Sequence, residues 1–509
     1  MEHDNRFRRK KKDVNNLEDV YDGRIYKRLV KDGILQSGNN FSFIFNTDGV
    51  PIFKSSQVSI WPIYLIINEL PYKKRMATEN MLFSGLWFGE TKSSMWTFLK
   101  PFYKSFIDLE QGVTFQIKNK GSVTCKAVLP GGTCDLPARC MICNAMQFNG
   151  VSSCWKCLQT GQTAKVSQRG HTRVFAFQND DPKGPHRTYA ETIQHAKDTL
   201  NNQMSGKKDY AVNGIKGLSW LGLVPSFDYV AGIGIDYMHG VLLGVQKTLL
   251  KLWFTAKFSG KHFSISLISK ADARLSEIAP TLEIKRMPRS MEEHLKYWKA
   301  NELCSFLLYF GIPVLYGILP DKHFQHYFLL VQAIYFLLKD SVSSLDLSDA
   351  EKLLFMFCEK FPSLYGAEFV TLNFHQLVHL VDDVRHLGPL YTHSCFAFED
   401  KNGFILKLIH GTQFIESQIL TAVSFVQKIP ELREKCITPG SESEEIYISL
   451  SCPRRPKNAQ LVSNSLNAYR LDEPVERYPG YSPATVNVKA FNRSSMFQDS
   501  RHIIIQFTL

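Results

Sequence analysis

Two acidic residues that end predicted strands are candidates for binding divalent cations. Asp48 closes the β-rich run FSFIFNTD, and Asp135 closes a second strand-like run that ends in GGTCD. Two-metal phosphoryl transfer needs carboxylates from separate strands that meet at one edge of a sheet. A third acid is expected from a later helix, but the chain has 48 acidic residues, and position alone does not choose among them. Either aspartate could instead simply cap a turn.

Cysteine and histidine pairs suggest a second kind of metal site. Cys154 and Cys157 form a Cys-x-x-Cys pair after a Phe-Asn-Gly turn, and such a pair is half of a tetrahedral zinc site. Far downstream, His375 and His379 have a spacing that puts both imidazoles on one face of a helix, where they can share a metal. Joining the pairs would tie two distant segments together. Gln376 occupies the position of the glutamate in a metalloprotease His-Glu-x-x-His motif.

Other interpretations of these pairs remain open. A thioredoxin-like redox pair is expected at a helix N-terminus early in a βαβ unit, a context that the segment around Cys154 lacks. Two histidines at this spacing also occur on helices by chance. Cys140 and Cys143 lie in a helix-like stretch, where small buried residues packed against a sheet explain them better than metal ligation. The eleven cysteines favour a reducing compartment with free thiols and metal ligands over a disulfide framework.

The elements that must position these residues change from strand-like to helical along the chain. The predicted strands cover residues 41–53, 58–71, 81–90 and 113–135. An amphipathic helix is expected over 95–112, with Pro101 as a potential kink. The pattern is helical from about residue 274 to 380, including an all-apolar, buried helix over 328–338. A capping box at Ser348-Asp349-Ala350-Glu351 predicts a helix start, and another helix is expected after Gly411.

Composition limits the class of protein. The chain has 509 residues, of which 44% are hydrophobic, so two or three structural units with a sizeable core are expected. The net charge of +12 is compatible with a polyanionic partner such as nucleic acid. The basic run from Arg6 to Lys12 could be a nuclear import signal, a nucleic-acid arm or a solvated tail. The longest uncharged stretch, from Cys304 to Pro320, is too short to span a membrane.

The chain resembles the transposases of CACTA-type (En/Spm) DNA transposons, the tnp2 family. The matching segments run in order from about residue 40 to residue 415. They are NTDGVPIFKSSQVSIWPIYLIINELP, CDLPARCMICNAMQFNGVSSCWKC, IDYMHGVLLGV, MPRSMEEHLKYWKANELCSFLLYFGIPVL, TLNFHQLVHLVDDVRHLGPLY and SCFAFEDKNGFILKLIHGT. The family belongs to the DDE recombinases, whose catalytic core is ribonuclease-H-like.

The resemblance implies roles for particular residues. It implies that Asp48, Asp135 and Glu399 form a triad that binds Mg²⁺ or Mn²⁺. It implies a zinc site with four ligands, which are Cys154, Cys157, His375 and His379. Asp236 and His239, in the motif Asp-Tyr-Met-His, are expected to support the catalytic core, although a turn aspartate and a buried histidine explain them equally well.

The resemblance also implies an α/β fold, in which a ribonuclease-H-like mixed sheet is interrupted by a large, mainly helical, zinc-clipped insertion. The expected division is a basic flexible segment (1–37), the first part of the core (38–145), the insertion (146–390), a returning core segment with the third acid (391–430) and a C-terminal extension (431–509).

The expected function is DNA cleavage and strand transfer at transposon ends in the nucleus, with double-stranded DNA as partner, no membrane, and self-association left open. Two alternatives stand beside it. One is a catalytically inactive or host-recruited DNA-binding protein, and the other is a zinc-stabilised interaction scaffold.

Overall fold

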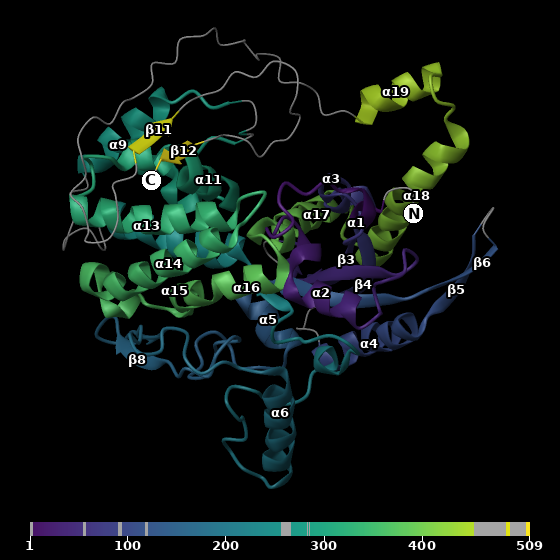
Figure 1. The fold of residues 1–509 in the computed structure, drawn as a ribbon, viewed down its shortest axis with the longest axis horizontal. Coiled ribbons are helices and arrows are strands. Elements are labelled where there is room, and N and C mark those ends of the chain that lie inside the picture. The colour runs from purple at the N-terminus through teal and green to yellow at the C-terminus, as the bar shows by residue number, and fades with distance from the viewer. Residues whose placement is uncertain are drawn as a thin grey trace.

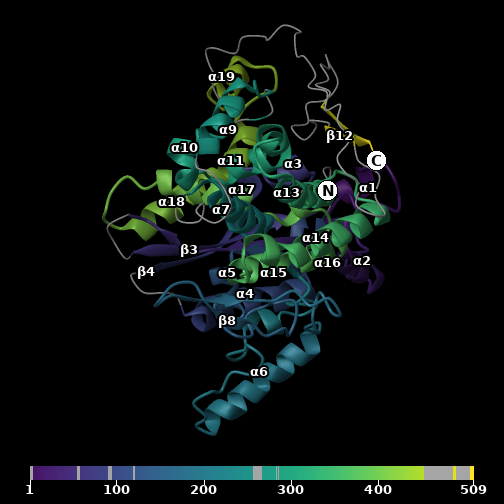
Figure 2. The same ribbon diagram turned by 90° about the vertical axis from the view of Figure 1, so that its left-hand side faces the viewer.

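A mixed sheet lies beside a large helical region in this computed structural model (Figure 1). The structure describes residues 4–53, 58–89, 94–117, 121–255, 266–281, 284, 286–451, 485–488 and 505–508. The helices of the middle of the chain gather on one side of the sheet. Helix α6 (Tyr189–Met204) points away from the body of the molecule, as Figure 2 shows from a second direction.

The sheet has six strands in a mixed arrangement. They are β1 (Phe41–Thr47), β2 (Val50–Pro51), β3 (Ser59–Ile67), β4 (Leu82–Gly89), β7 (Ala127–Cys134) and β10 (Ile233–Ile235). The order is β10-β7-β1-β3-β2, and β4 also pairs with β3. Strand β1 runs parallel to β7, which runs parallel to β10, whereas β3 is antiparallel to β1 and to β4. The strands predicted from the β-branched and aromatic runs are therefore confirmed.

The region predicted as strand over 113–135 is divided into three strands. A separate hairpin of β5 (Val113–Ile117) and β6 (Gly121–Cys125) precedes β7, which enters the central sheet. Figure 1 shows this hairpin reaching outward beyond β4. Of these three strands, β7 alone is buried along its whole length, because it lies between β1 and β10 and is covered on both faces.

Helices cover both faces of the sheet. On one face, α4 (Met95–Gln111) packs Phe102 and Phe106 against the aromatic residues of β1, and α5 (Leu136–Ile142) lies beside it. Helix α4 continues through Pro101. On the other face lie α2 (Arg24–Lys31), α17 (Phe396–Lys407) and α18 (Ile415–Cys436).

The N-terminal segment differs from the flexible lead-in that its polar sequence predicts. Residues Asn5–Arg8 form helix α1, and Val20, Ile25 and Leu29 provide an apolar face that packs into the sheet's second core. Much of the basic run is paired within the chain, since Arg9 and Lys11 both bind Asp22, at 2.7 and 2.9 Å. Apolar side chains at helical spacing outweigh the surrounding charge here.

The helical region forms its own hydrophobic core. Its main helices are α7 (Lys247–Phe254), α9 (Ser266–Glu277), α11 (Ala300–Ser305), α12 (Gly311–Leu315), α13 (Asp321–Leu337), α14 (Ser344–Tyr365), α15 (Leu372–His375) and α16 (Leu380–Leu387). The buried helix expected over 328–338 is confirmed as part of α13. Among the described residues, no helix combines the length and apolar character needed to cross a membrane.

The helix start predicted at Ser348 is wrong. Helix α14 begins one turn earlier, because Ser343 is its N-cap and forms the capping box with Asp346. The Ser343 hydroxyl accepts from the Asp346 amide at 3.1 Å, and the Asp346 carboxylate accepts from the Ser343 amide at 2.9 Å. Ser348 and Glu351 therefore lie inside the helix. Two capping-box patterns lie close together in the sequence, and the earlier one forms the cap.

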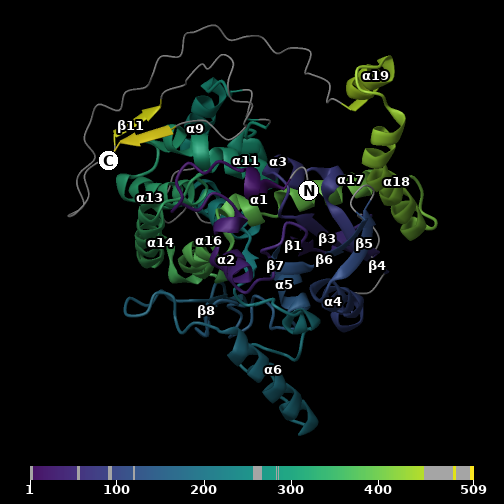
Figure 3. The same ribbon diagram turned by 45° about the vertical axis from the view of Figure 1, so that its right-hand side comes forward.

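The C-terminal part reaches away from the sheet. The first half of α18 packs on the sheet, whereas its second half and the following helix α19 (Glu442–Ser451) extend beyond the compact body in Figures 1 and 3. Two short strands, β11 (Thr485–Val488) and β12 (Ile505–Thr508), pair with each other. The apolar end HIIIQFTL lies partly outside the described residues.

Candidate active site and metal centre

The register of the parallel strands brings three aspartates to one edge of the sheet. Asn46 of β1 pairs with Thr133 of β7, so the residues two positions further on, Asp48 and Asp135, emerge side by side. Ile235 of β10 pairs with Cys134, which places Asp236 next to Asp135. Because all three strands run in the same direction, their carboxyl ends meet at this edge, as the runs ending in Asp48 and Asp135 predict.

Glu399 reaches the same edge from helix α17. The helix is anchored by Cys395, whose sulfur accepts from the Asn46 side chain at 3.5 Å and lies 3.6 Å from the Thr133 hydroxyl. The Glu399 amide donates to the Cys395 carbonyl at 2.9 Å, so Glu399 stands one turn beyond that anchor. There it meets Asp48, whose side-chain hydrogen bond with Glu399 acts to lower the pKa of Glu399, against the larger effect of burial.

The carboxyl groups at this edge repel one another. Burial, followed by the charges of Asp135 and Glu399, raises the pKa of Asp48 to about 7. Burial is also the main cause of the raised pKa values of Asp135 and Glu399. Several partly buried carboxylates that face one another form a site that a divalent cation would stabilise.

Other acids are excluded from this cluster by their positions. Glu69 binds the amide of Ser42 at 2.9 Å, near the start of β1, and therefore lies at the opposite edge of the sheet. Asp108 is exposed near the C-terminal end of α4. Glu399 is the acid from a later helix that the sequence alone did not single out.

Replacing Asp48 should reveal this repulsion as a pH-dependent gain in stability. Because its folded pKa lies above that of the unfolded chain, Asp48 costs stability as pH rises from about 4 to about 7, and the full cost remains above that range. In buffer without divalent cations, Asp48→Asn should therefore stabilise the protein by on the order of 1–3 kcal/mol at pH 8 and by less at pH 5.5. Urea denaturation at the two pH values measures this difference.

The matched control is Asp108→Asn, because Asp108 is exposed and distant from the cluster. It should change stability little at either pH. A gain for Asp48→Asn that is equal at both pH values would contradict the electrostatic explanation.

Buried Asp236 and half-buried His239 form a pair beside the acids. One oxygen of Asp236 accepts from the His239 amide at 2.9 Å and from its Nδ1 at 2.7 Å, and the other accepts from the Cys395 amide at 2.9 Å. Burial alone would lower the pKa of His239, but the bond to Asp236 and the charges of Asp135 and Glu399 raise it to about 9. Asp236 thus holds both a cationic imidazole and the start of the helix that carries Glu399.

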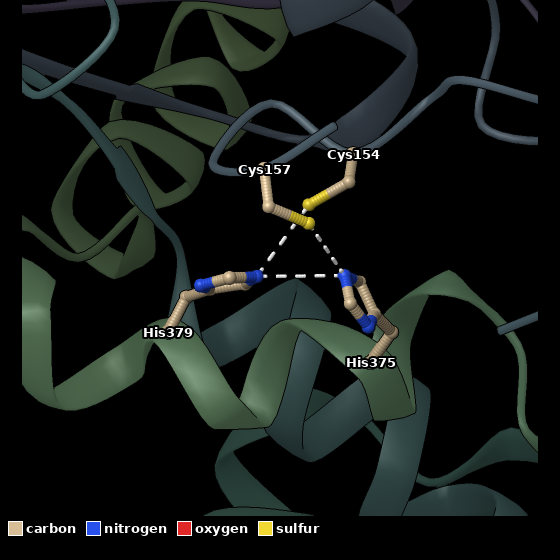
Figure 4. A group of neighbouring side chains, drawn as sticks. All are labelled: Cys154, Cys157, His375 and His379. Carbon is tan, nitrogen blue, oxygen red and sulfur yellow. Dashed lines mark hydrogen bonds between the residues drawn. The ribbon is translucent and has the colours of Figure 1, made fainter. Parts of the chain in front are cut away.

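The predicted zinc ligands lie together in a buried cluster, which Figure 4 shows. Cys157 Sγ is 3.2 Å from His375 Nε2, Cys154 Sγ is 3.7 Å from His379 Nε2, and the two Nε2 atoms are 3.4 Å apart. Tetrahedral bonds of roughly 2.0–2.3 Å place neighbouring ligand atoms roughly 3.3–3.8 Å apart. The four side chains therefore have the donor set and the spacing for a metal such as zinc.

The two halves of this cluster come from distant segments. Cys154 and Cys157 lie in the loop that follows α5. His375 ends α15, and His379 ends the 3-10 turn that leads into α16. Burial opposes ionisation of Cys154, but its contacts with Cys157 and the two imidazoles lower its pKa well below the ordinary value. Cys140 and Cys143 are buried on and just after α5, as expected, and do not belong to the cluster.

A buried ion pair also connects the cysteine loop to helix α16. Lys156, between the two cysteines, binds Asp383 at 2.6 Å and also donates to the carbonyls of Val230 and Ile233. The other oxygen of Asp383 accepts from the Ile235 amide at 2.6 Å. The pair therefore joins the cysteine loop, helix α16 and strand β10, whose next residue is Asp236.

Lys156→Met should destabilise the protein strongly, because it leaves the Asp383 carboxylate buried without its cation. The expected loss is about 3–5 kcal/mol. The double variant Lys156→Met/Asp383→Leu should lose less than the sum of the single changes, since no charge is left unpaired. Urea denaturation of the metal-loaded proteins measures these values, with Lys428→Met in an exposed ion pair as a control that should change little. Additive losses would show that the pair does not act as a unit.

Sequence reasoning missed three residues of this region. Lys156 and Asp383 could have been suspected, because one lies inside the Cys-x-x-Cys pair and the other lies one helical turn after His379. Nothing in the local sequence marks Cys395, whose contacts are made with strands far away in the chain.

The fold and the site together define an α/β protein with an acidic cluster at one sheet edge and a buried two-cysteine, two-histidine group that could bind a metal. Residues 6–209 match the family described as transposase family tnp2. This match supports the resemblance to CACTA-type transposases that the motifs predicted. None of the curated proteins compared with the chain matches it.

The family match includes only part of the site. The residues within it are Asp48, Asp135, Cys154 and Cys157. The residues beyond it are Asp236, His239, His375, His379 and Glu399. Their connection to the matched segment is provided by the tertiary structure.

Proposed function

We propose that the protein is a DDE-type transposase that cuts DNA at the ends of a CACTA-type element and joins the freed ends to target DNA. The match of residues 6–209 to the tnp2 family supports a transposase-like function. The observation that carries the catalytic proposal is the convergence of Asp48, Asp135 and Glu399 at one sheet edge. Such a cluster suits two-metal phosphoryl transfer.

The sheet is compatible with a ribonuclease-H-like core. Three parallel strands, β1, β7 and β10, follow one another in the sheet, and the antiparallel strand β3 and then β4 extend it on the far side of β1. In this proposal, 38–145 and 391–430 form the core around the acids, and 146–390 is the zinc-clipped insertion. Strand β10 shows that the chain returns to the sheet within that insertion.

The acids would hold Mg²⁺ or Mn²⁺, which would supply activation of the attacking hydroxyl and stabilisation of the leaving oxygen. Asp48 and Asp135 present their carboxylates from rigid neighbouring strands, and Glu399 closes the cluster from its anchored helix. His239 faces the acids as a cation held by Asp236 and offsets part of their repulsion. Both residues have a supporting role, through charge balance and placement of the Glu399 helix.

Zinc fits the cluster of Cys154, Cys157, His375 and His379, where it would act as a structural link. The ligands are buried and bring together the cysteine loop and the segment that leads into α16. Structural zinc sites of this kind contribute directly to folding. In this role the metal fixes the position of the helical region relative to the sheet, and no catalytic step uses it.

Double-stranded DNA is the proposed partner, and the nucleus the proposed location. The transposase family supports DNA binding, and the net charge of +12 agrees with it. Self-association belongs to the same proposal, because cutting and joining two element ends requires them to be held together.

The proposal is tested by nicking of supercoiled plasmid in Mg²⁺ or Mn²⁺ and by binding of a linear duplex at increasing salt. Metal-dependent nicking with steep salt dependence of binding is the expected result. Binding without nicking in either metal would favour the inactive DNA-binding protein. Neither binding nor nicking would favour the zinc-stabilised scaffold.

A further inference from the structure

Three aromatic rings and a lysine form an exposed cluster at the N-terminal end of α4. The rings of Trp96 and Trp220 are stacked with centroids 4.3 Å apart, and Tyr103 lies 4.9 Å from Trp220. Lys100 Nζ lies over the Trp220 ring at 5.8 Å. Half of Trp96 is exposed, at 50%. We call Trp96, Trp220, Tyr103 and Lys100 the aromatic platform.

The indole N–H of Trp220 is bonded within the protein, so it does not account for the exposure of the cluster. The Trp220 indole N–H donates to the Trp96 backbone carbonyl at 2.7 Å, which holds the two rings together. Trp96 stacks on Trp220 and is half exposed to solvent. Lys100 and Lys104 are one turn apart on the exposed side of α4, so positive charge borders the rings.

The platform lies at the same end of the sheet as the acids. Phe43 packs on Phe106 and Phe45 packs on Phe102, each at a centroid distance of 6.2 Å, so α4 runs antiparallel to β1. The start of α4 therefore lies beside the end of β1, which Asp48 follows. Figure 3 shows α4 and α5 together on one face of the strands.

We propose that the aromatic platform stacks an unpaired DNA base next to the phosphodiester that is cut. Aromatic faces bordered by lysines suit a base and its phosphate, because every base has a flat face and the backbone is anionic. The inference rests on the proposed function, since it supposes DNA at the acidic edge. Opening a base pair beside the cut would bring the backbone closer to the carboxylates, and the platform would hold the released base.

An exposed aromatic residue elsewhere provides a matched comparison. Tyr297 is 61% exposed and has Lys296 over its ring at 5.4 Å. It belongs to the helical region and, among the residues that the structure describes, has no stacked aromatic partner. If DNA were attracted to any exposed aromatic ring beside a lysine, changing Tyr297 would weaken binding as much as changing the platform. The proposal predicts weakening only when the platform is changed.

The test uses the full chain and two DNA probes in buffer with Ca²⁺ in place of Mg²⁺. One probe is a blunt duplex, and the other is the same duplex with a short unpaired extension that contains 2-aminopurine. Tighter binding of the extended probe and quenching of 2-aminopurine fluorescence are expected. Trp96→Ala should weaken binding of the extended probe by about 5- to 100-fold and leave blunt-duplex binding unchanged. Trp96→Phe should keep most of the preference, and Tyr297→Ala should keep all of it.

Several outcomes would overturn the inference. These are equal binding of the two probes by the unmutated protein, equal weakening of both probes by Trp96→Ala, or the same loss with Tyr297→Ala. Trp220→Phe is the second variant, which keeps a ring but removes the indole bond to Trp96, and it should lower quenching partly. A protein that binds the blunt duplex without preference contradicts only this inference. Absence of binding to either probe contradicts the proposed function as well.

Discussion

Glu399→Gln is expected to reduce Mg²⁺-dependent DNA cutting by at least about a hundredfold, while DNA binding and zinc content stay unchanged. Glutamine keeps the size and hydrogen-bonding capacity of the side chain but removes the charge that would hold a divalent cation. Losses of this order are typical when one member of a preorganised catalytic group is removed. The measurement is nicking of supercoiled plasmid, with duplex affinity and zinc determined on the same preparations.

Substitutions at nearby acidic residues test whether the loss of cutting is specific to the acids of the site or follows from the loss of any negative charge. Asp400→Asn is the matched control, because Asp400 follows Glu399 on the same helix and is exposed. It should cut DNA like the unmutated protein. Asp48→Asn and Asp135→Asn should behave like Glu399→Gln, and a double variant should be scarcely worse than a single one, since the acids act as a unit. Strong Mg²⁺-dependent cutting by the Glu399→Gln protein would refute the assignment of Glu399.

Removal of a ligand from the two-cysteine, two-histidine group should strongly reduce both metal content and stability. Cys157→Ser and His379→Ala are each expected to lose the bound zinc and about 3 kcal/mol or more of unfolding free energy. The reason is that the metal would join the cysteine loop to the α15–α16 segment, and its binding energy is available only in the folded state. Elemental analysis gives the zinc per chain, and urea denaturation gives the stability.

Cys140→Ser is the control for this prediction, because Cys140 is buried on α5 and outside the cluster. It should retain one zinc per chain. If zinc were lost only when Cys140 or Cys143 is changed, that pair would be the ligands instead. If the unmutated protein contained no zinc, the proposed site would be refuted. Retention of zinc in the Glu399→Gln protein would show that the two sites are independent.

The metal link and the acidic edge are nevertheless connected through the chain. Lys156 lies between the zinc ligands and contacts β10, and Asp236 directly follows β10 and holds the Cys395 amide. Glu399 follows Cys395 by one helical turn. Loss of zinc should therefore lower DNA cutting as well as stability, whereas loss of Glu399 should lower cutting alone.

Much of the site follows from patterns in the sequence. Strand-like runs that end in Asp48 and Asp135, and the spacing of the cysteine and histidine pairs, predicted these residues before any fold was known. Those predictions depend on local geometry. Alternation of apolar and polar residues is typical of a strand, and side chains four residues apart lie on one face of a helix. The family resemblance then implied Glu399, a choice that local geometry could not make.

Only the tertiary structure decided how the distant segments meet. Cys395 contacts Asn46 and Thr133, and this packing places Glu399 above the acids. Strand β10 joins the sheet within a region predicted to be an insertion, and Lys156 finds Asp383 there. The physical reason is that such contacts depend on the shape and register of surfaces that exist only after folding, whereas strand and helix patterns are set by neighbours along the chain.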